Sequence, residues 1–105
     1  MHEIRVIAKV TRIDRATADL YHGVPTPRAR RFPPDVVAAA VRKLDVLNSA
    51  GSLLDLRSPP GNRLEALRGD LRGFHSIRVN DRWRIVFRWV DGQAYEVRLV
   101  DYHGG

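Results

Sequence analysis

The second half of the chain alternates between apolar and polar residues. Three segments carry this pattern clearly, at residues 74–79, 82–89 and 94–100. A shorter segment at residues 63–67 precedes them. Such alternation places successive side chains on opposite faces of a strand. Asn80 and Asp81 separate the first two long segments, and Asp91 with Gly92, a strong two-residue hairpin signal, separates the last two. The pattern therefore predicts an antiparallel meander, with a turn at 68–70 before it.

The first half of the chain begins with alternation and continues with helical periodicity. Residues 4–13 predict a strand. A short helix follows, with Asp14 as its N-cap and Gly23 at its end, and a longer helix begins at Pro34 and stops before Gly51. The segment between the two helices is expected to be a linker.

One face of the longer helix is apolar. Val37, Val41 and Leu44 form the stripe, and Ala40 and Leu47 lie beside it. This stripe is expected to cover the sheet. Strand, two helices and then several strands predict one α+β domain over residues 1–105, with both helices on one face of a mainly antiparallel sheet.

The composition adds a strong positive charge. The chain of 105 residues has a formal net charge of +6, and only Lys9 and Lys43 of its 18 basic residues are lysines. A polyanionic partner, either a nucleic acid or an acidic protein, suits this charge, although a GC-rich coding sequence accounts equally well for the preference for arginine. Cysteine is absent, which excludes disulfides and thiolate metal sites. With no apolar run typical of a signal peptide or a membrane span, we expect a soluble, cytoplasmic protein.

Most of the candidate binding residues are arginines on one face of the meander. In the strand at 82–89, the core side is predicted to carry Trp83, Ile85, Phe87 and Trp89. The opposite, solvent-facing side is predicted to carry Arg82, Arg84, Val86 and Arg88, with Arg78 and Arg98 from the neighbouring strands and Arg68 and Arg72 at the adjoining turn. These arginines form either an ordinary solvated surface or a site for a phosphate backbone or an acidic protein segment, which would relieve their mutual repulsion.

The last strand leads into candidate chemistry. Tyr95, Val97 and Leu99 are expected to face the core, and the strand then runs into an acid, a phenol and an imidazole at Asp101, Tyr102 and His103. These three groups suit proton transfer, and the plainer alternative is a surface strand terminus. Neither a metal-ligand spacing nor a phosphate loop occurs in the sequence, so an enzyme would work by acid-base chemistry without a metal or another cofactor.

Residues 59–103 resemble the HigB-type toxins of the RelE/ParE superfamily. The motifs that carry the resemblance are GNRLEALRGD, SIRVNDRWRI and the terminal VDYH, and the two predicted helices also match, so that it covers roughly residues 10–103. Residues 1–9 have no obvious counterpart and are expected to be an extension of the first strand or the product of a misassigned start codon.

The resemblance implies a compact α+β fold and a ribonuclease that cuts messenger RNA on the ribosome without a metal. It also implies a helix-turn-helix antitoxin of the HigA type as partner, with operator DNA contacted only through that antitoxin and no membrane involved. The family's catalytic residues fall on Asp101, Tyr102, His103 and Arg84. His103 would exchange protons, Asp101 would orient it, Tyr102 would donate a hydrogen bond or stack on a base, and Arg84 would hold the phosphate.

Two points remain open in this comparison. Glu65 stands where some relatives have a second catalytic histidine, so either Glu65 acts as the base or the two-histidine scheme does not apply. The ParE branch shares the scaffold but inhibits DNA gyrase without catalysis, which leaves a non-enzymatic gyrase inhibitor or an inactive regulatory relative as alternatives.

Overall fold

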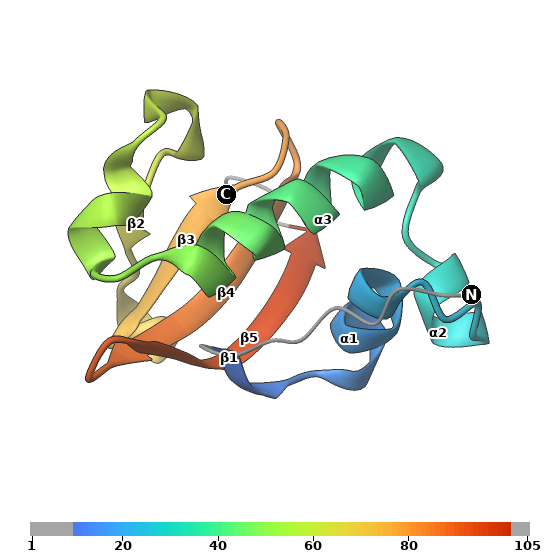
Figure 1. The fold of residues 1–105 in the computed structure, drawn as a ribbon, viewed down its shortest axis with the longest axis horizontal. Coiled ribbons are helices and arrows are strands. Elements are labelled where there is room, and N and C mark those ends of the chain that lie inside the picture. The colour runs from blue at the N-terminus through green and yellow to red at the C-terminus, as the bar shows by residue number, and fades with distance from the viewer. Residues whose placement is uncertain (1–9, 102–105) are drawn as a thin grey trace.

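The computed structural model describes residues 10–101, which form a five-stranded sheet with its α-helices on one face (Figure 1). The strands are β1 (Val10–Ile13), β2 (Glu65–Ala66), β3 (Phe74–Arg78), β4 (Trp83–Val90) and β5 (Gln93–Asp101). The helices are α1 (Arg15–His22), α2 (Pro27–Arg30) and α3 (Pro34–Ser49), with short 3-10 helices η1 (Leu53–Arg57), η2 (Pro60–Asn62) and η3 (Gly69–Leu71). The predicted α+β class is confirmed. Residues 4–9 of the predicted first strand lie outside the described residues.

The sheet has the order β1-β5-β4-β3-β2, and the predicted meander is its centre. β3, β4 and β5 pair antiparallel, whereas β1 pairs parallel to β5. Asp91 and Gly92 both have positive φ, 49° and 78°, as a tight two-residue hairpin between twisted strands requires. Because β1 covers its second edge, β5 is an interior strand of the sheet. The predicted strand at 63–67 contains only the two residues of β2.

The main core lies between α3, α1 and the helix-facing side of the sheet. The buried residues of α3 are Val36, Ala40, Leu44 and Leu47. The predicted stripe began with Val37 and Val41, but these two residues lie at the partly buried margin of the core. Val36 and Ala40, each one position earlier, are the buried residues. No helix among residues 10–101 is long and apolar enough to span a membrane.

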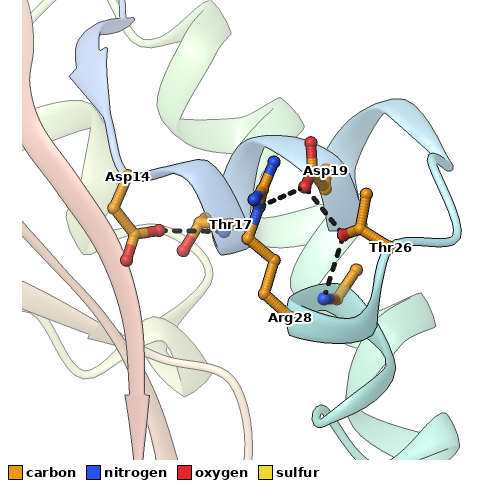
Figure 2. A network of polar contacts seen from close by, with 6 residues as sticks. Asp14, Thr17, Asp19, Thr26 and Arg28 are labelled. Carbon is orange, nitrogen blue, oxygen red and sulfur yellow. Dashed lines mark hydrogen bonds and ion pairs between the residues drawn. The ribbon is translucent and has the colours of Figure 1, made fainter.

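The linker expected between the two helices contains the short helix α2, which the sequence analysis missed. Thr26 is its N-cap, accepting from the Ala29 amide (3.2 Å), and Asp19 of α1 ties α2 back to α1 (Figure 2). Asp19 Oδ2 accepts from Thr26 Oγ1 (2.8 Å) and from Arg28 Nε (2.7 Å). The hydrogen bond from Thr26 is the main cause that lowers the pKa of Asp19 below its ordinary value.

A bulge in β5 changes the predicted alternation. Between the pairs Val86–Arg98 and Arg88–Tyr95 the register shifts, and Glu96 has a φ of 51°. The extra residue turns Tyr95 away from the helices, so the prediction that Tyr95 faces the core was wrong. Ala94 takes the buried position instead, whereas Val97 and Leu99 face the core as predicted.

A buried hydroxyl completes the second edge of β5 beyond the end of β1. The Asp14 amide bonds to the Val97 carbonyl (2.9 Å), and Thr17 Oγ1 on α1 then accepts from the Leu99 amide (2.9 Å). Thr17 is fully buried. Asp14 in turn fixes the start of α1, because its Oδ1 accepts from the Thr17 amide (2.8 Å), which confirms the predicted N-cap (Figure 2).

Replacing Thr17 by valine should leave the buried Leu99 amide without an acceptor. We expect the free energy of unfolding in urea to fall by about 1–3 kcal/mol, and the Leu99 amide to lose protection from hydrogen exchange. Thr17→Ser keeps the acceptor and should keep that protection. Equal exchange at Leu99 in both variants would show that the hydroxyl does not hold the strand.

Stability at low pH should depend on Asp19. Because its pKa is lowered in the folded state, its contribution is present above the unfolded value of about 3.8 and is lost as the pH falls through the folded value. We expect Asp19→Asn to lower the urea midpoint at pH 7 and to approach the parent protein near pH 3. Asp70→Asn, an exposed carboxylate, controls for the change in net charge. A constant difference across this pH range would contradict the prediction.

Candidate functional site

Arg84 is the one buried charged residue among the described residues of the predicted site. It is only 8% exposed. Its Nε donates to Ser76 Oγ (2.7 Å), and its Nη2 donates to the carbonyl of Arg63 (2.5 Å). The expectation that Arg84 lies on a solvent-facing surface was therefore wrong. Its guanidinium is instead held at one orientation by two neighbouring segments, β3 and the residues that precede β2.

A second, small apolar cluster lies on the same face of the sheet as Arg84. Leu67, Phe74 and Val86 are buried on the face of the sheet that points away from α3, which we call the outer face. Leu71 and Val100 pack against them. The β2–η3 connection thus covers the middle of the outer face, and the arginines occupy its margins rather than one open surface.

Glu65 lies beside Arg84. It pairs with Ser76 in the β2–β3 register, so both are on the outer face, and its Oε1 lies 4.0 Å from Arg84 Nη2. The Glu65 side chain is 52% exposed. A carboxylate open to solvent therefore sits beside a fixed, buried guanidinium, an arrangement that suits proton transfer next to a bound anion.

The segment before Glu65 is anchored by a buried amide. Asn62 Nδ2 donates to the carbonyls of Leu56 and Ser58 (3.2 Å each), and its Oδ1 accepts from Lys43 Nζ on α3. Burial is the main cause that lowers the pKa of Lys43. These contacts fix the chain just before Arg63, whose carbonyl holds Arg84.

Asp101 lies on the other side of the sheet. It pairs with Trp83, which packs against the main core, and its Oδ2 accepts from Arg82 Nη2 (3.0 Å). The structure therefore brings Arg84 together with Glu65, and Asp101 together with Arg82, at the same end of β4. Tyr102 and His103, the other two predicted catalytic residues, lie outside the described residues.

The remaining predicted RNA-binding arginines have varied surroundings. Arg78 pairs across the sheet with Arg84 and makes an ion pair with Asp81. Arg88 Nε lies 3.1 Å from Glu96 Oε2. Arg68 and Arg72 are exposed on either side of η3, and Arg98 is exposed on β5. The prediction that Arg78 shares a face with Arg84, and Arg98 with Arg88, is confirmed by the register.

Ser76 was missed as a part of the site. Its hydroxyl is fully buried against the Arg84 guanidinium. The alternation of residues 74–78 already places Ser76 on the same face as Arg78, and this could have marked it as a neighbour of the arginines on β4. Among the described residues, no three His, Cys, Asp or Glu side chains are grouped as metal ligands.

Comparison with known proteins gives the family. The model of the RelE-like toxin of type II toxin-antitoxin system HigB matches residues 21–103. The chain belongs to this toxin family. It is 49% identical to Toxin HigB-1 of Vibrio cholerae over 72 residues, which cover 69% of this chain and 76% of that protein.

Two further similarities are more partial. Endoribonuclease HigB of Proteus vulgaris is 44% identical over 41 residues, covering 39% of this chain and 45% of the relative. The fold is similar to that of the YoeB-YefM complex from Staphylococcus aureus, with a TM-score of 0.57, 15% identity, and coverage of 96% of this chain and 98% of the other. The family match includes the terminal Asp101, Tyr102 and His103, and the structural similarity supports the fold.

Replacing Arg84 by alanine should destabilise the protein as well as change the site. Ser76 Oγ and the Arg63 carbonyl would lose their donor, so we expect the free energy of unfolding to fall by about 2–4 kcal/mol. Arg68→Ala, which removes an exposed arginine, should stay within about 0.5 kcal/mol of the parent protein. Urea unfolding measures both, and equal stability of the two variants would contradict the structural role of Arg84.

Proposed function

We propose that this toxin is an endoribonuclease that cuts messenger RNA on the ribosome by attack of the RNA's own 2′-hydroxyl, without a metal. The observation that carries the proposal is the family match, which continues through residue 103 and so includes the terminal Asp-Tyr-His. The name of the Proteus relative, an endoribonuclease, supports the same reaction. The net charge of +6 suits a phosphate-rich substrate.

The reaction requires a base for the 2′-hydroxyl proton, an acid for the departing 5′-oxygen and positive charge at the phosphorane. In the proposal, His103 exchanges protons with the reacting oxygens and Tyr102 hydrogen-bonds the substrate or stacks on a base. Arg84 supplies the positive charge, and its fixed orientation supports this role because a held charge need not reorganise during the reaction.

The two carboxylates have different proposed roles. Glu65 is the candidate for the second acid-base group, supported by its exposure and by the 4.0 Å between its Oε1 and Arg84 Nη2. Asp101 is proposed to position His103. Its ion pair with Arg82 holds that carboxylate at the end of β5, two residues before the imidazole. Arg68, Arg72, Arg78, Arg82, Arg88 and Arg98 are proposed to bind RNA phosphates along the margins of the sheet.

We also propose a HigA-type helix-turn-helix protein as the antitoxin that neutralises this toxin. The family is defined by toxin-antitoxin pairs, and a structure of similar fold is a complex of the toxin YoeB with YefM. Contact with operator DNA would then occur through the antitoxin. The cytoplasm, where ribosomes and messenger RNA occur, is the proposed compartment.

The test of this function is His103→Gln. Glutamine keeps the approximate size of the imidazole but does not exchange a proton near neutral pH. We expect cleavage of ribosome-bound message to slow by about 10² to 10⁴, the usual scale for one general acid or base. Mapping transcript 5′ ends after brief induction, together with single-turnover cleavage on purified ribosomes, measures the loss.

The matched control is His22→Gln, which makes the same change at an exposed histidine at the end of α1. It should cleave at the parent rate. Normal cleavage by the His103 variant would remove this imidazole from the mechanism. Intact messages in cells arrested by the parent toxin, accompanied by blocked DNA gyrase, would instead indicate a gyrase inhibitor of the ParE type.

A further inference from the structure

A groove with a positive balance of charge lies where β1 meets α1, away from Arg84. Its volume is about 820 Å³. The lining residues are Arg12, Ile13, Asp14, Arg15, Phe74, Glu96, Val97 and Arg98. Its two carboxylates are already engaged, since Asp14 caps α1 and Glu96 pairs with Arg88. With three arginines and two carboxylates, its lining carries a net positive charge.

Two residues of the groove have strained backbones. Arg12 and Glu96 have φ values of 60° and 51°, in the left-handed region that residues other than glycine seldom occupy. The β1–β5 register places them side by side, because the residues on either side of each are paired with one another. Strain of this kind persists where the surrounding structure imposes it, and it is concentrated at binding sites. Both residues line the groove.

Three arginines, Arg12, Arg15 and Arg98, line the groove. Among the described residues, neither Arg12 nor Arg15 takes part in a salt bridge. Arg15 is the first residue of α1, next to the Asp14 cap. The surplus of positive charge in the lining suits a bound anion.

The Phe74 ring contacts two guanidiniums, that of Arg98 in the groove lining and that of Arg88 beside the groove. The Arg88 and Arg98 guanidinium carbons lie 4.6 Å and 5.7 Å from the centre of the Phe74 ring. Stacking on the ring and the ion pair with Glu96 restrict Arg88, so less entropy is lost when it binds a phosphate. Arg88 is four residues along β4 from Arg84, roughly 13 Å at the usual strand rise. That separation spans more than one nucleotide of an extended strand.

We propose that this groove is a second RNA site, in which Arg12 and Arg15 bind the phosphodiester backbone at a distance from the cleavage position. The proposal rests on the proposed ribonuclease function and deepens it. RNA is favoured over an acidic protein segment because Phe74 and Arg98, which line the groove, lie on the same outer face as Arg84, where the substrate RNA is proposed to bind. The bound strand is either the message or ribosomal RNA, which present the same backbone.

The test measures binding without cleavage. The probe is a single-stranded RNA with 2′-O-methyl groups throughout, which has no attacking hydroxyl. Fluorescence anisotropy at several KCl concentrations gives the Kd and its salt dependence. For Arg12→Gln/Arg15→Gln we expect the Kd to rise about tenfold. The slope of log Kd against log salt should fall by about 0.7 for each charge lost.

The control is Arg42→Gln/Arg57→Gln, which removes the same charge from exposed positions on α3 and η1. Arg15→Gln alone does not alter Arg12, whose backbone is strained, and so should not disturb the fold. It should show about half of the loss in slope. A second arm measures sedimentation of the toxin with purified ribosomes that carry no message. Weaker binding of the free strand with unchanged binding to ribosomes identifies the message as the ligand, and weaker binding to the ribosomes identifies ribosomal RNA.

Two results would overturn the proposal. The first is equal binding of the groove variant and its charge-matched control in both arms. The second is polyglutamate that binds the parent toxin as tightly as RNA does and loses that binding in the groove variant, which would make the groove a site for an acidic protein. Neither result depends on nuclease activity, so failure of the groove and failure of the proposed function can be told apart.

Discussion

The interior position of β5 is the constraint on which the rest of the structure depends. An interior strand needs hydrogen-bond partners on both edges for its backbone. β4 supplies one edge, and the other is completed first by β1 and then by the Thr17 hydroxyl, which accepts from the Leu99 amide. The same threonine fixes where α1 lies, and α1 contributes Leu20 and Tyr21 to the main core. The strand that leads to the candidate catalytic residues thereby has partners on both edges from Ala94 to Leu99.

Periodicity and turn chemistry predicted most of the elements correctly. The helix at 34–49 and the hairpin at Asp91 and Gly92 are strong local signals, and they do not depend on what packs against them. The bulge at Glu96 was invisible to alternation, because one residue in a left-handed conformation resets the pattern for every residue before it. Tyr95 was assigned to the wrong face for this reason.

The candidate site was predicted less completely than the fold. Alternation correctly put Arg84 on the outer face, but it gives the direction of a side chain and not what covers it. The groups that contact the Arg84 guanidinium come from β3 and from the segment before β2, which are different parts of the chain. Because Arg84 is buried, a substitution there is expected to lower the stability of the fold as well as to remove the positive charge from the candidate site. Ser76 and the carbonyl of Arg63, which fix the guanidinium, become recognisable only once the strands are paired.

The parallel pairing of β1 with β5 also links folding to the order of synthesis. Thr17 and Leu99 are 82 residues apart, and β5 leaves the ribosome after every other described element. The sheet cannot close on a partly made chain, because the strand between β1 and β4 is then missing. Sheet closure on a growing chain must therefore wait until β5 has emerged. It is a late folding step that joins distant parts of the chain.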